Sequence, residues 1–249
     1  MKRQSKNAAK NADHDADDLF IKPTSDLFTA VLWSSPKNEP LLRDFLNAVL
    51  IDDHRPTIQE AKVLNPFNIR EFDVDKKLIL DVLVRDEWSR KYNIEVQTAP
   101  HSAFCERMLF QWADTYSKSL QKGEHYTKLR SVKSVILTDF PIFPNLRNLH
   151  TIFEIRAREN PEMLLSEHFE MHFLRLGDAR KRQMEGLNVL FDGLQHWLNF
   201  FAFGATVTED KMSQRVKSNS AVMEAYKQFQ LFKSDAEVRE FEHRRHWRP

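Results

Sequence analysis

The stretch Lys77–Gln97, with the sequence KLILDVLVRDEWSRKYNIEVQ, decides the fold. Two segments rich in β-branched, leucine and aromatic residues, Lys77–Arg85 and Lys91–Gln97, enclose the polar segment Asp86–Arg90. Apolar runs of this length joined by a short polar stretch are typical of a β-hairpin. We therefore predict two antiparallel strands whose turn is centred on Trp88.

The register of this hairpin is expected to bring two carboxylates together. With Trp88 at the centre, antiparallel pairing places Asp81 directly opposite Glu95. Because side chains alternate between the two faces of a strand, both acids lie on the same face. That face is expected to hold Asp81, Leu83, Asn93, Glu95 and Gln97. The opposite face is apolar and is the predicted core side, with Leu80, Val82, Val84, Tyr92, Ile94 and Val96.

Two helices and one strand are predicted before the hairpin. Ser25 or Asp26 is placed to cap a first helix. Apolar residues recur at three- and four-residue spacing over 41–50, which predicts a second helix with one buried stripe. The segment 58–69 is expected to form an imperfect strand, because Pro66 interrupts it.

A helix and a further strand are predicted after the hairpin. The helix covers 102–122, with Gly123 as its expected C-terminal stop, and the strand covers 132–138. The order strand, helix, strand is typical of a βαβ crossover, which pairs its two strands in parallel. The whole core order is therefore αβββαβ, which predicts an α/β fold with a mixed central sheet.

The rest of the chain is expected to add strands over 151–155 and 168–176. An apolar periodic stretch over 179–203 and a polar one over 208–246 then predict a C-terminal helical appendage. The predicted organisation is a disordered charged tail over 1–18, an α/β domain over 19–180 and a C-terminal helical region over 181–249.

The composition excludes several classes of protein. Lys and Arg number 37 against 36 Asp and Glu, so any nucleic-acid site has to be a local patch. All five glycines lie beyond residue 122, which excludes the glycine-rich phosphate loops of nucleotide-binding folds and predicts no nucleotide cofactor. The single cysteine excludes an internal disulfide framework and fits a reducing compartment. No apolar stretch is long enough to span a membrane, so we expect a cytoplasmic protein without a membrane partner.

The paired acids point to a metal ion. Two opposed carboxylates repel each other and raise one another's pKa, so a stable fold needs a counter-charge beside them. Mg²⁺ prefers carboxylate oxygens and keeps several waters, which suits Asp81 and Glu95 at an open sheet edge. A metal held there polarises a phosphoryl oxygen and activates water. The alternative is that both acids face solvent and are neutralised by Lys76, Lys77 or Lys91.

These residues resemble the PD-(D/E)XK nuclease superfamily, and within it the recombination-promoting nuclease and transposase family. The resemblance covers roughly residues 20–180. It is carried by the segments Phe20–Phe28, Leu41–Leu50, Leu80–Val82, Tyr92–Gln97, Phe104–Arg107 and Tyr116–Tyr126. It implies a bacterial, Mg²⁺-dependent DNA endonuclease that is linked to recombination or mobile elements.

The resemblance also assigns roles to residues. Asp81 and Glu95 match the two acidic metal ligands of the superfamily, and Gln97 stands at the position of its lysine. A glutamine carries no charge, so Gln97 is expected to orient a water by hydrogen bonding. Arg107 and Lys118, on the following helix, are candidates for the missing cation and for phosphate binding. Lys91 lies about 13 Å from Glu95 at roughly 3.3 Å per strand residue, which is too far.

Competing constellations remain open at this point. His168 and His172 are placed to bind zinc if they lie on a helix, but the alternating apolar residues favour a strand with an exposed His, Glu, His row. Cys105 with His101 has the spacing of a nucleophile and base, although an inert buried thiol is preferred. The stripe Phe104, Met108, Trp112 and Tyr116 is interpreted as core rather than as a base-stacking platform, and the basic segment 244–248 as a solvated terminus rather than a phosphate contact. A glycosidase carboxylate pair lacks a sugar-binding cleft.

Three functions are compatible with the sequence. The first is the nuclease, which as a two-fold homodimer would cut both strands most simply. The second is a catalytically inactive DNA-binding or protein-interaction member of the same fold. The third is a folding scaffold that binds neither metal nor DNA.

Overall fold

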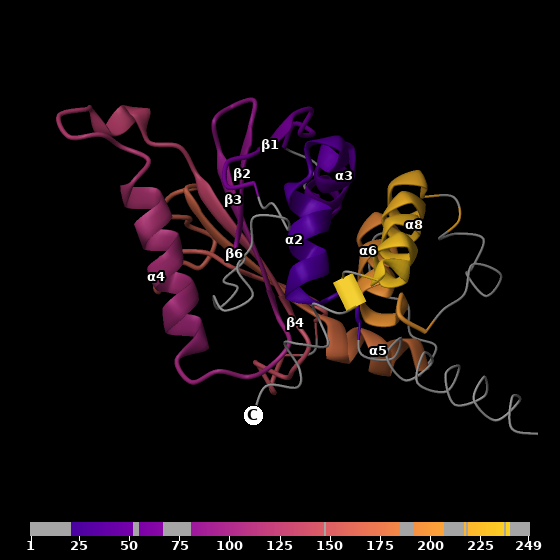
Figure 1. Ribbon diagram of the computed structural model, residues 1–249. Helices are drawn as coiled ribbons and strands as arrows, with labels where there is room; N and C mark the ends of the chain where they lie inside the picture. The colour runs from indigo at the N-terminus through magenta and orange to yellow at the C-terminus, as the bar shows by residue number, and fades with distance from the viewer. Residues whose placement is uncertain are drawn as a thin grey trace, which may run out of the picture.

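The computed structural model describes residues 21–51, 55–66, 81–146, 148–184, 192–206, 217, 219–236 and 238–239. At its centre is one six-stranded sheet with the strand order β1-β2-β3-β4-β6-β5 (Figure 1). The strands are β1 (Ala61–Val63), β2 (Val82–Asp86), β3 (Lys91–Gln97), β4 (Val132–Thr138), β5 (His150–Phe153) and β6 (Phe169–Arg175). The helices are α2 (Asp26–Ser34), α3 (Glu39–Val49), α4 (Phe104–Ser117), α5 (Leu176–Met184), α6 (Asp192–Phe203) and α8 (Ser220–Ser234), and short 3₁₀ turns η1 (Pro36–Asn38) and η3 (Tyr126–Lys128) complete the elements.

The sheet is mixed, as the sequence predicts. Strands β1, β2 and β3 pair antiparallel, β3, β4 and β6 pair parallel, and β5 closes the other edge antiparallel to β6. The parallel β3–β4 pair is joined through α4, which is the predicted βαβ crossover. The α/β fold with an αβββαβ core order and C-terminal helices is therefore confirmed.

The hairpin register is also confirmed. Val82 pairs with Ile94 and Val84 with Tyr92, which are the partners expected for a turn centred on Trp88. The buried Asp86 fixes this turn, because its carboxylate accepts the amide hydrogens of Trp88 and Arg90 and the Tyr92 hydroxyl. The Arg90 side chain forms an ion pair with the same carboxylate at 2.5 Å. The Asp86 carboxylate thus accepts hydrogen bonds both from the backbone of the turn and from the Arg90 and Tyr92 side chains.

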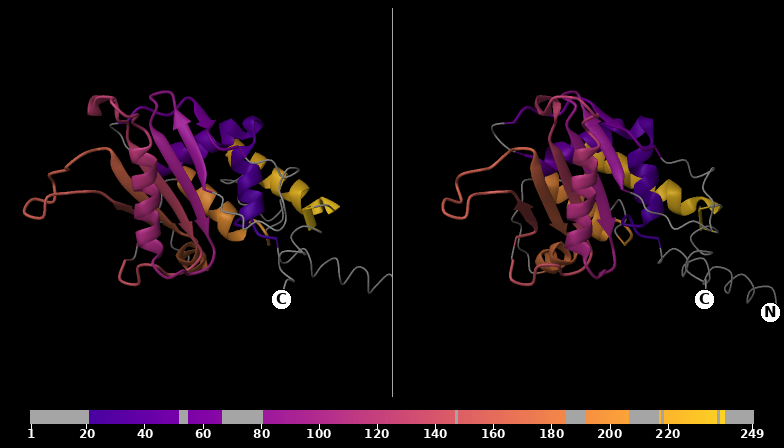
Figure 2. Two further views of the ribbon diagram at one scale, coloured as in Figure 1. Left: turned by 60° about the vertical axis from the view of Figure 1, so that its left-hand side comes forward. Right: turned by 90° about the vertical axis from the view of Figure 1, so that its left-hand side faces the viewer.

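The two faces of the sheet are covered differently. Figure 1 shows α4 on one side, and α2, α3, α6 and α8 on the other. The larger core lies under the four helices and contains the apolar face of the hairpin, including Val82, Val84, Tyr92 and Ile94. A smaller core lies under α4 and joins Phe104 and Met108 to β4 and β6. Figure 2 shows α4 lying across one face of the sheet, and because Arg107 of α4 donates to Glu95, the acidic face of the hairpin is on this side.

The C-terminal helices share the larger core with the N-terminal ones. Trp197 of α6 packs against Trp33 of α2 and Phe45 of α3, and Phe229 of α8 packs against Phe28. Burial of such large aromatic side chains is a major contribution to stability. The division of the chain at residue 180 stays a prediction, and the structure adds that residues on both sides of it form one hydrophobic core.

The strand predicted over 58–69 is wrong in length, because only Ala61–Val63 pairs as β1. The side chain of Asn65 takes over the hydrogen bonds that a longer strand would make, and Pro66 has no amide hydrogen to donate. Residues 67–69 lie outside the described residues.

The helix predicted over 102–122 is also too long, since α4 ends at Ser117. The amide and the hydroxyl of Ser119 both bond to the Tyr116 carbonyl, three residues back, which replaces the four-residue pairing of a continued helix. Gly123 has a positive φ of 89° but sits in a later turn, so its predicted role as the helix stop is wrong.

The His168–His172 segment forms a strand, so the helical zinc pair is wrong. The expected exposed row is wrong as well, because Glu170 and His172 are 2% and 1% exposed. Lys133 of β4 and Arg55 both form ion pairs with Glu170, which compensates its burial. Pairing between β4 and β6 creates this network, and the sequence of either strand alone does not show it.

The remaining predicted elements agree with the structure or fall outside it. Ser25 caps α2 by accepting from the Phe28 amide, and the predicted apolar stripe of α3 is buried. The tail 1–18 and the basic segment 244–248 lie outside the described residues, as do parts of the two C-terminal helical predictions. Across the described ranges, no helix is long and apolar enough to cross a membrane.

Candidate active site

Asp81 and Glu95 come together where β2 begins and β3 nears its end. Asp81 directly precedes Val82, and the β2–β3 register continued by one residue places it opposite Glu95. The side chain of Asn65 holds the backbone there. Its Nδ2 donates to the Asp81 carbonyl oxygen at 2.6 Å, and its Oδ1 accepts from the Leu83 amide at 2.7 Å. The structure therefore brings the two predicted acids to one place.

The environment of Glu95 strongly favours its protonated form. The residue is only 6% exposed. Burial, followed by the hydrogen bond and the negative charge of Asp81, raises the pKa of Glu95 to about 9, against the opposing charge of Arg107. In the absence of a cation, the acid pair therefore holds a proton at neutral pH. A cation that binds both carboxylates has to displace that proton.

Arg107, on the first turn of α4, is the cation that meets the acid pair. Its Nη2 donates to Glu95 Oε1 at 2.9 Å and to Gln97 Oε1 at 2.7 Å. The alternative in which the acids face solvent and Lys91 neutralises them is therefore wrong for Glu95, which is buried and paired with Arg107. Lys76 and Lys77 lie outside the described residues. The Arg107 side chain is 35% exposed, so part of it is accessible to a bound phosphate.

Gln97, at the end of β3, shares Arg107 with Glu95. Its Oε1 accepts from Arg107, and its Nε2 donates to the Ala99 carbonyl oxygen at 3.0 Å. A glutamine amide has two Nε2 hydrogens, so one is left for a water. The expected water-orienting role of Gln97 stays a prediction, and the geometry gives this residue a second task, which is to hold Arg107.

Three buried polar atoms of this site have no hydrogen-bond partner in the described part of the chain. They are Asp81 Oδ1, Arg107 Nε and Gln111 Oε1. Gln111 lies one helical turn after Arg107, and its Nε2 donates to Asp81 Oδ2 at 2.6 Å. A buried oxygen without a donor is costly, and either the proton of Glu95 or a cation satisfies it.

The donor set fits a divalent cation with oxygen preference. Asp81 and Glu95 would hold Mg²⁺, which commonly binds one or two carboxylates and retains waters. Within the described ranges, no three His, Cys, Asp or Glu side chains cluster closely enough to form a complete metal cage. The unpaired Asp81 oxygen is the observation in the structure that matches a cation.

Three residues of this site were not predicted from the sequence. Asp26, at the start of α2, adds a negative charge that also raises the pKa of Glu95. Gln111 could have been found from its four-residue spacing to Arg107 on one helix face. Asn65 gives no signal in the sequence, because its partners are backbone groups of another strand.

The structure does not bring Lys118 to the acids. This residue follows the last residue of α4 and lies roughly 16 Å from Arg107 along the helix axis. Its Nζ pairs with Asp114 at 2.7 Å. Cys105 is half-buried, and burial followed by the charge of Glu106 raises the pKa of its thiol, which does not favour a nucleophile.

The αβββαβ core, with two acids from adjoining strands on one face, defines the PD-(D/E)XK class of nuclease folds. The model of the PD-(D/E)XK nuclease family transposases matches residues 23–248, and the chain belongs to this family. The resemblance expected from the sequence is thereby confirmed. No curated protein and no solved structure matches the chain.

Members of this class are typically hydrolases that act on phosphodiester bonds, and they generally use divalent metals. The transposase family implies DNA as the partner.

Proposed function

We propose that this protein is a Mg²⁺-dependent DNA endonuclease that acts in recombination or on mobile elements. The observation that carries the proposal is the meeting of the half-buried Asp81 with the buried Glu95, where the negative charge of Asp81 helps to raise the pKa of Glu95 and the buried Asp81 Oδ1 has no hydrogen-bond partner in the described residues. Two adjoining carboxylates with an unsatisfied buried oxygen destabilise the fold, and a protein without metal-dependent activity has no need to keep them. A site that binds a cation does need both acids.

Each residue of the site has a separate role in phosphodiester hydrolysis. Asp81 and Glu95 would hold the metal, which supplies a polarised phosphoryl oxygen and an activated water. Arg107 offers its exposed guanidinium edge to the phosphate and stabilises the negative charge that develops there. Gln97 fixes Arg107 and orients the attacking water with its remaining amide hydrogen.

Cleavage of supercoiled plasmid tests the proposal. Wild-type protein with Mg²⁺ should nick or linearise the plasmid, and EDTA should abolish this activity. The Asp81→Asn and Glu95→Gln variants should lose at least about a hundredfold in rate, because each removes a ligand charge. Glu106→Gln is the matched control, since Glu106 is an exposed acid on the same turn as Arg107.

The rival proposal is an inactive DNA-binding member of the same fold. The neutral Gln97 at the lysine position favours it, because no ammonium group is present there. Binding of plasmid without cleavage by the wild type would support the rival. Equal cleavage by all variants would show that the activity does not depend on Asp81 and Glu95.

The homodimer has a separate test. Light scattering measures the mass of the protein in solution, and a dimer is expected if linear product forms without a nicked intermediate.

A further inference from the structure

Three cationic side chains stand next to one another across the first three strands of the sheet. Lys62 of β1 is the direct partner of Arg85 of β2, and Arg85 is the direct partner of Lys91 of β3. Directly paired residues of antiparallel strands present their side chains on the same face. Lys62 and Arg85 are exposed, and Lys91 is half-buried. We call these three residues the cationic row.

The cationic row has no counter-charge in the described part of the chain. None of its members forms an ion pair or a side-chain hydrogen bond there, although exposed acids are close in sequence. Glu87 instead accepts the backbone amides of Gln59 and Glu60. Like charges directly opposite each other across strands are destabilising. Burial, followed by the neighbouring charge of Arg85, lowers the pKa of Lys91.

The row lies on the same face as the acid pair. Lys91 and Glu95 are four residues apart in β3, so they share a face and are separated by about 13 Å. On this face α4 packs over β4 and β6, through Phe104, Met108, Ile136, Phe169, Met171 and Phe173. No helix of the described residues packs over β1 and β2 on this side. Within the described residues, the β1–β2 side of this face therefore has no helix over it, with the cations at one end and, at the other, the acids that Arg107 and Gln111 of α4 contact.

We propose that Lys62, Arg85 and Lys91 bind the phosphate backbone of duplex DNA and hold it along this stretch of the sheet. The inference deepens the proposed function, because the same duplex would reach Asp81 and Glu95. Neighbouring strands are about 4.8 Å apart, so the row spans roughly 10 Å and can meet more than one phosphate. A separation of 13 Å corresponds to about four base pairs at 3.4 Å each. The row would thus contact the backbone about four base pairs from the scissile bond.

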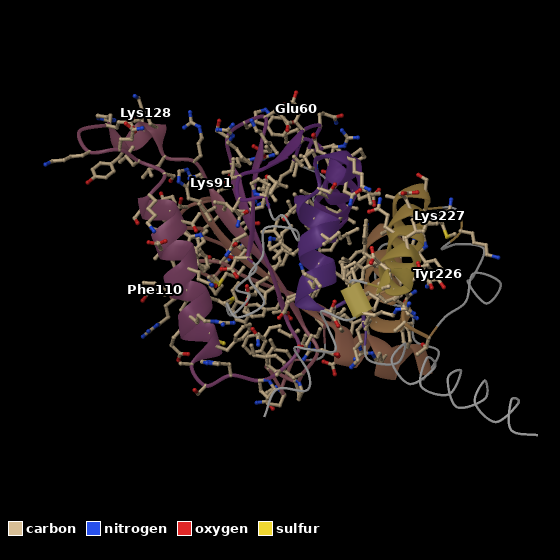
Figure 3. The ribbon with its side chains drawn as sticks, in the orientation of Figure 1. Glu60, Lys91, Phe110, Lys128, Tyr226 and Lys227 are labelled. Atoms are coloured by element: carbon tan, nitrogen blue, oxygen red, sulfur yellow. The ribbon has the colours of Figure 1, made fainter. Side chains whose placement is uncertain are left out.

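The cationic row lies on the α4 side of the sheet, away from the C-terminal helices. Figure 3 shows Lys91 between the upper part of α4 and the hairpin, whereas Lys227 lies on α8 at the opposite side. With a net charge of only +1, the chain has no general attraction for DNA. Affinity for a duplex therefore has to come from a local cluster of this kind.

Metal-free binding tests the row separately from cleavage. Fluorescence anisotropy with a 20-base-pair duplex in EDTA, over a series of salt concentrations, gives the slope of log K against log salt. Each lost phosphate contact lowers the magnitude of that slope by about 0.9. The Arg85→Gln/Lys91→Gln variant should therefore reduce it by about 2, and addition of Lys62→Gln by about 3 in total.

The matched control removes the same charge elsewhere. Lys37→Gln/Lys227→Gln changes two exposed lysines on the helical side and should leave the slope unchanged. The row variants should also unfold at the wild-type temperature or above it, because they relieve repulsion between paired strands. A loss of binding through misfolding would instead appear as a lower unfolding temperature. In that case the single variant Arg85→Gln is used, and it should lower the magnitude of the slope by about 0.9.

An unchanged slope in the row variants would overturn the inference, as would equal losses in the control. Lys62 also lies on an edge strand, where lysine discourages edge-to-edge association. If Lys62→Gln self-associates but binds DNA as the wild type does, Lys62 protects the sheet edge, and the proposal that it binds phosphate is wrong. If the row variants lower the salt dependence of binding as expected but the wild type never cleaves, the inference about the cationic row is supported and the nuclease proposal fails. If the wild type cleaves, the row variants should need a higher protein concentration than the wild type for half-maximal cleavage.

Discussion

Gln111 donates to Asp81 through Nε2, while its own Oε1 is buried without a partner in the described residues. This amide therefore orients the acid, and its unsatisfied oxygen is the cost of that position. Residues that orient metal-binding carboxylates commonly contribute ten- to hundredfold to metal affinity.

Gln111→Leu should weaken Mg²⁺ binding about tenfold, because Asp81 loses the hydrogen bond that fixes its rotamer. Isothermal titration with Mg²⁺ measures this directly, without any cleavage assay. Phe110→Leu, at the neighbouring exposed position of α4, is the control and should bind as the wild type does. Equal affinity in Gln111→Leu would show that Asp81 is held by Asn65 and the backbone alone.

Arg107 and Gln97 permit a compensation experiment. If Arg107 supplies the cation missing at position 97, Arg107→Gln should slow single-turnover cleavage about a hundredfold. The double variant Arg107→Gln/Gln97→Lys should regain at least tenfold of this loss, because it returns a positive charge beside Glu95. A double variant no faster than Arg107→Gln would mean that the charge is needed on α4 itself.

The acids of this site could be predicted from the sequence, but the contacts that their partners make could not. Asp81 and Glu95 follow from the two-residue period of a strand and from one assumption about the turn centre. Arg107 was a candidate without an assigned contact. Which face of α4 meets the acids depends on how the crossover packs over β4, and that packing is not encoded in local spacing.

At the scale of elements, the Asp86 turn decides whether the acids meet at all. A shift of one residue in the hairpin would move Glu95 to the opposite face of the sheet. Asp86 prevents this by accepting four hydrogen bonds within the turn, from Trp88, Arg90 and Tyr92. Burial, followed by the charge of Asp86, raises the pKa of the Tyr92 hydroxyl, which therefore stays a donor.

Asp86→Asn should lower the free energy of unfolding by about 3 kcal/mol, because it leaves Arg90 and Tyr92 facing an amide in a buried site. Urea denaturation followed by circular dichroism measures the change. Glu87→Gln, one residue further on, keeps one oxygen for the Gln59 amide and loses only the longer bond from the Glu60 amide at an exposed site, so it should cost less than about 1 kcal/mol. Similar losses in both variants would remove the special role of Asp86.

The predicted elements fail at their ends rather than in their order. Local spacing predicts the stripe of α3 and the strands β3 and β4 well, because α3 buries one apolar stripe and the two strands are buried over most or all of their length. It misses the end of α4 at Ser117 and the shortness of β1, because side chains there compete for backbone hydrogen bonds. Such competition depends on single side-chain contacts, and apolar periodicity does not report them.

At the scale of the whole molecule, a buried polar network holds the sheet on the face opposite the acid pair. Glu170 accepts from Arg55, Lys133 and His172, and His172 contacts His150 of the edge strand at 3.0 Å. Burial alone would raise the pKa of Glu170, but the hydrogen bonds from His172 and Arg55 and the charge of Lys133 hold it well below its usual range. The network thus ties three strands to the segment after α3.

This network makes the fold sensitive to acid. Burial, followed by the neighbouring His172, lowers the pKa of His150 to about 3, so the imidazole is neutral in the folded protein. The unfolded chain binds a proton at an ordinary pKa of about 6.5. The contribution of His150 to stability is therefore complete above pH 6.5 and is lost as the pH falls toward 3. Glu170 acts in the same direction below its unfolded pKa, since its folded pKa is also lowered.

Stability measured by urea denaturation should therefore fall between pH 7 and pH 5.5, with about 1 kcal/mol of the loss due to His150. His150→Gln keeps a hydrogen-bonding amide next to His172 but cannot take up a proton, so its loss over the same interval should be smaller by that amount. His125→Gln, which alters an exposed histidine of the crossover loop, should follow the wild-type curve. If His150→Gln falls as steeply as the wild type, the acid sensitivity belongs to groups other than His150.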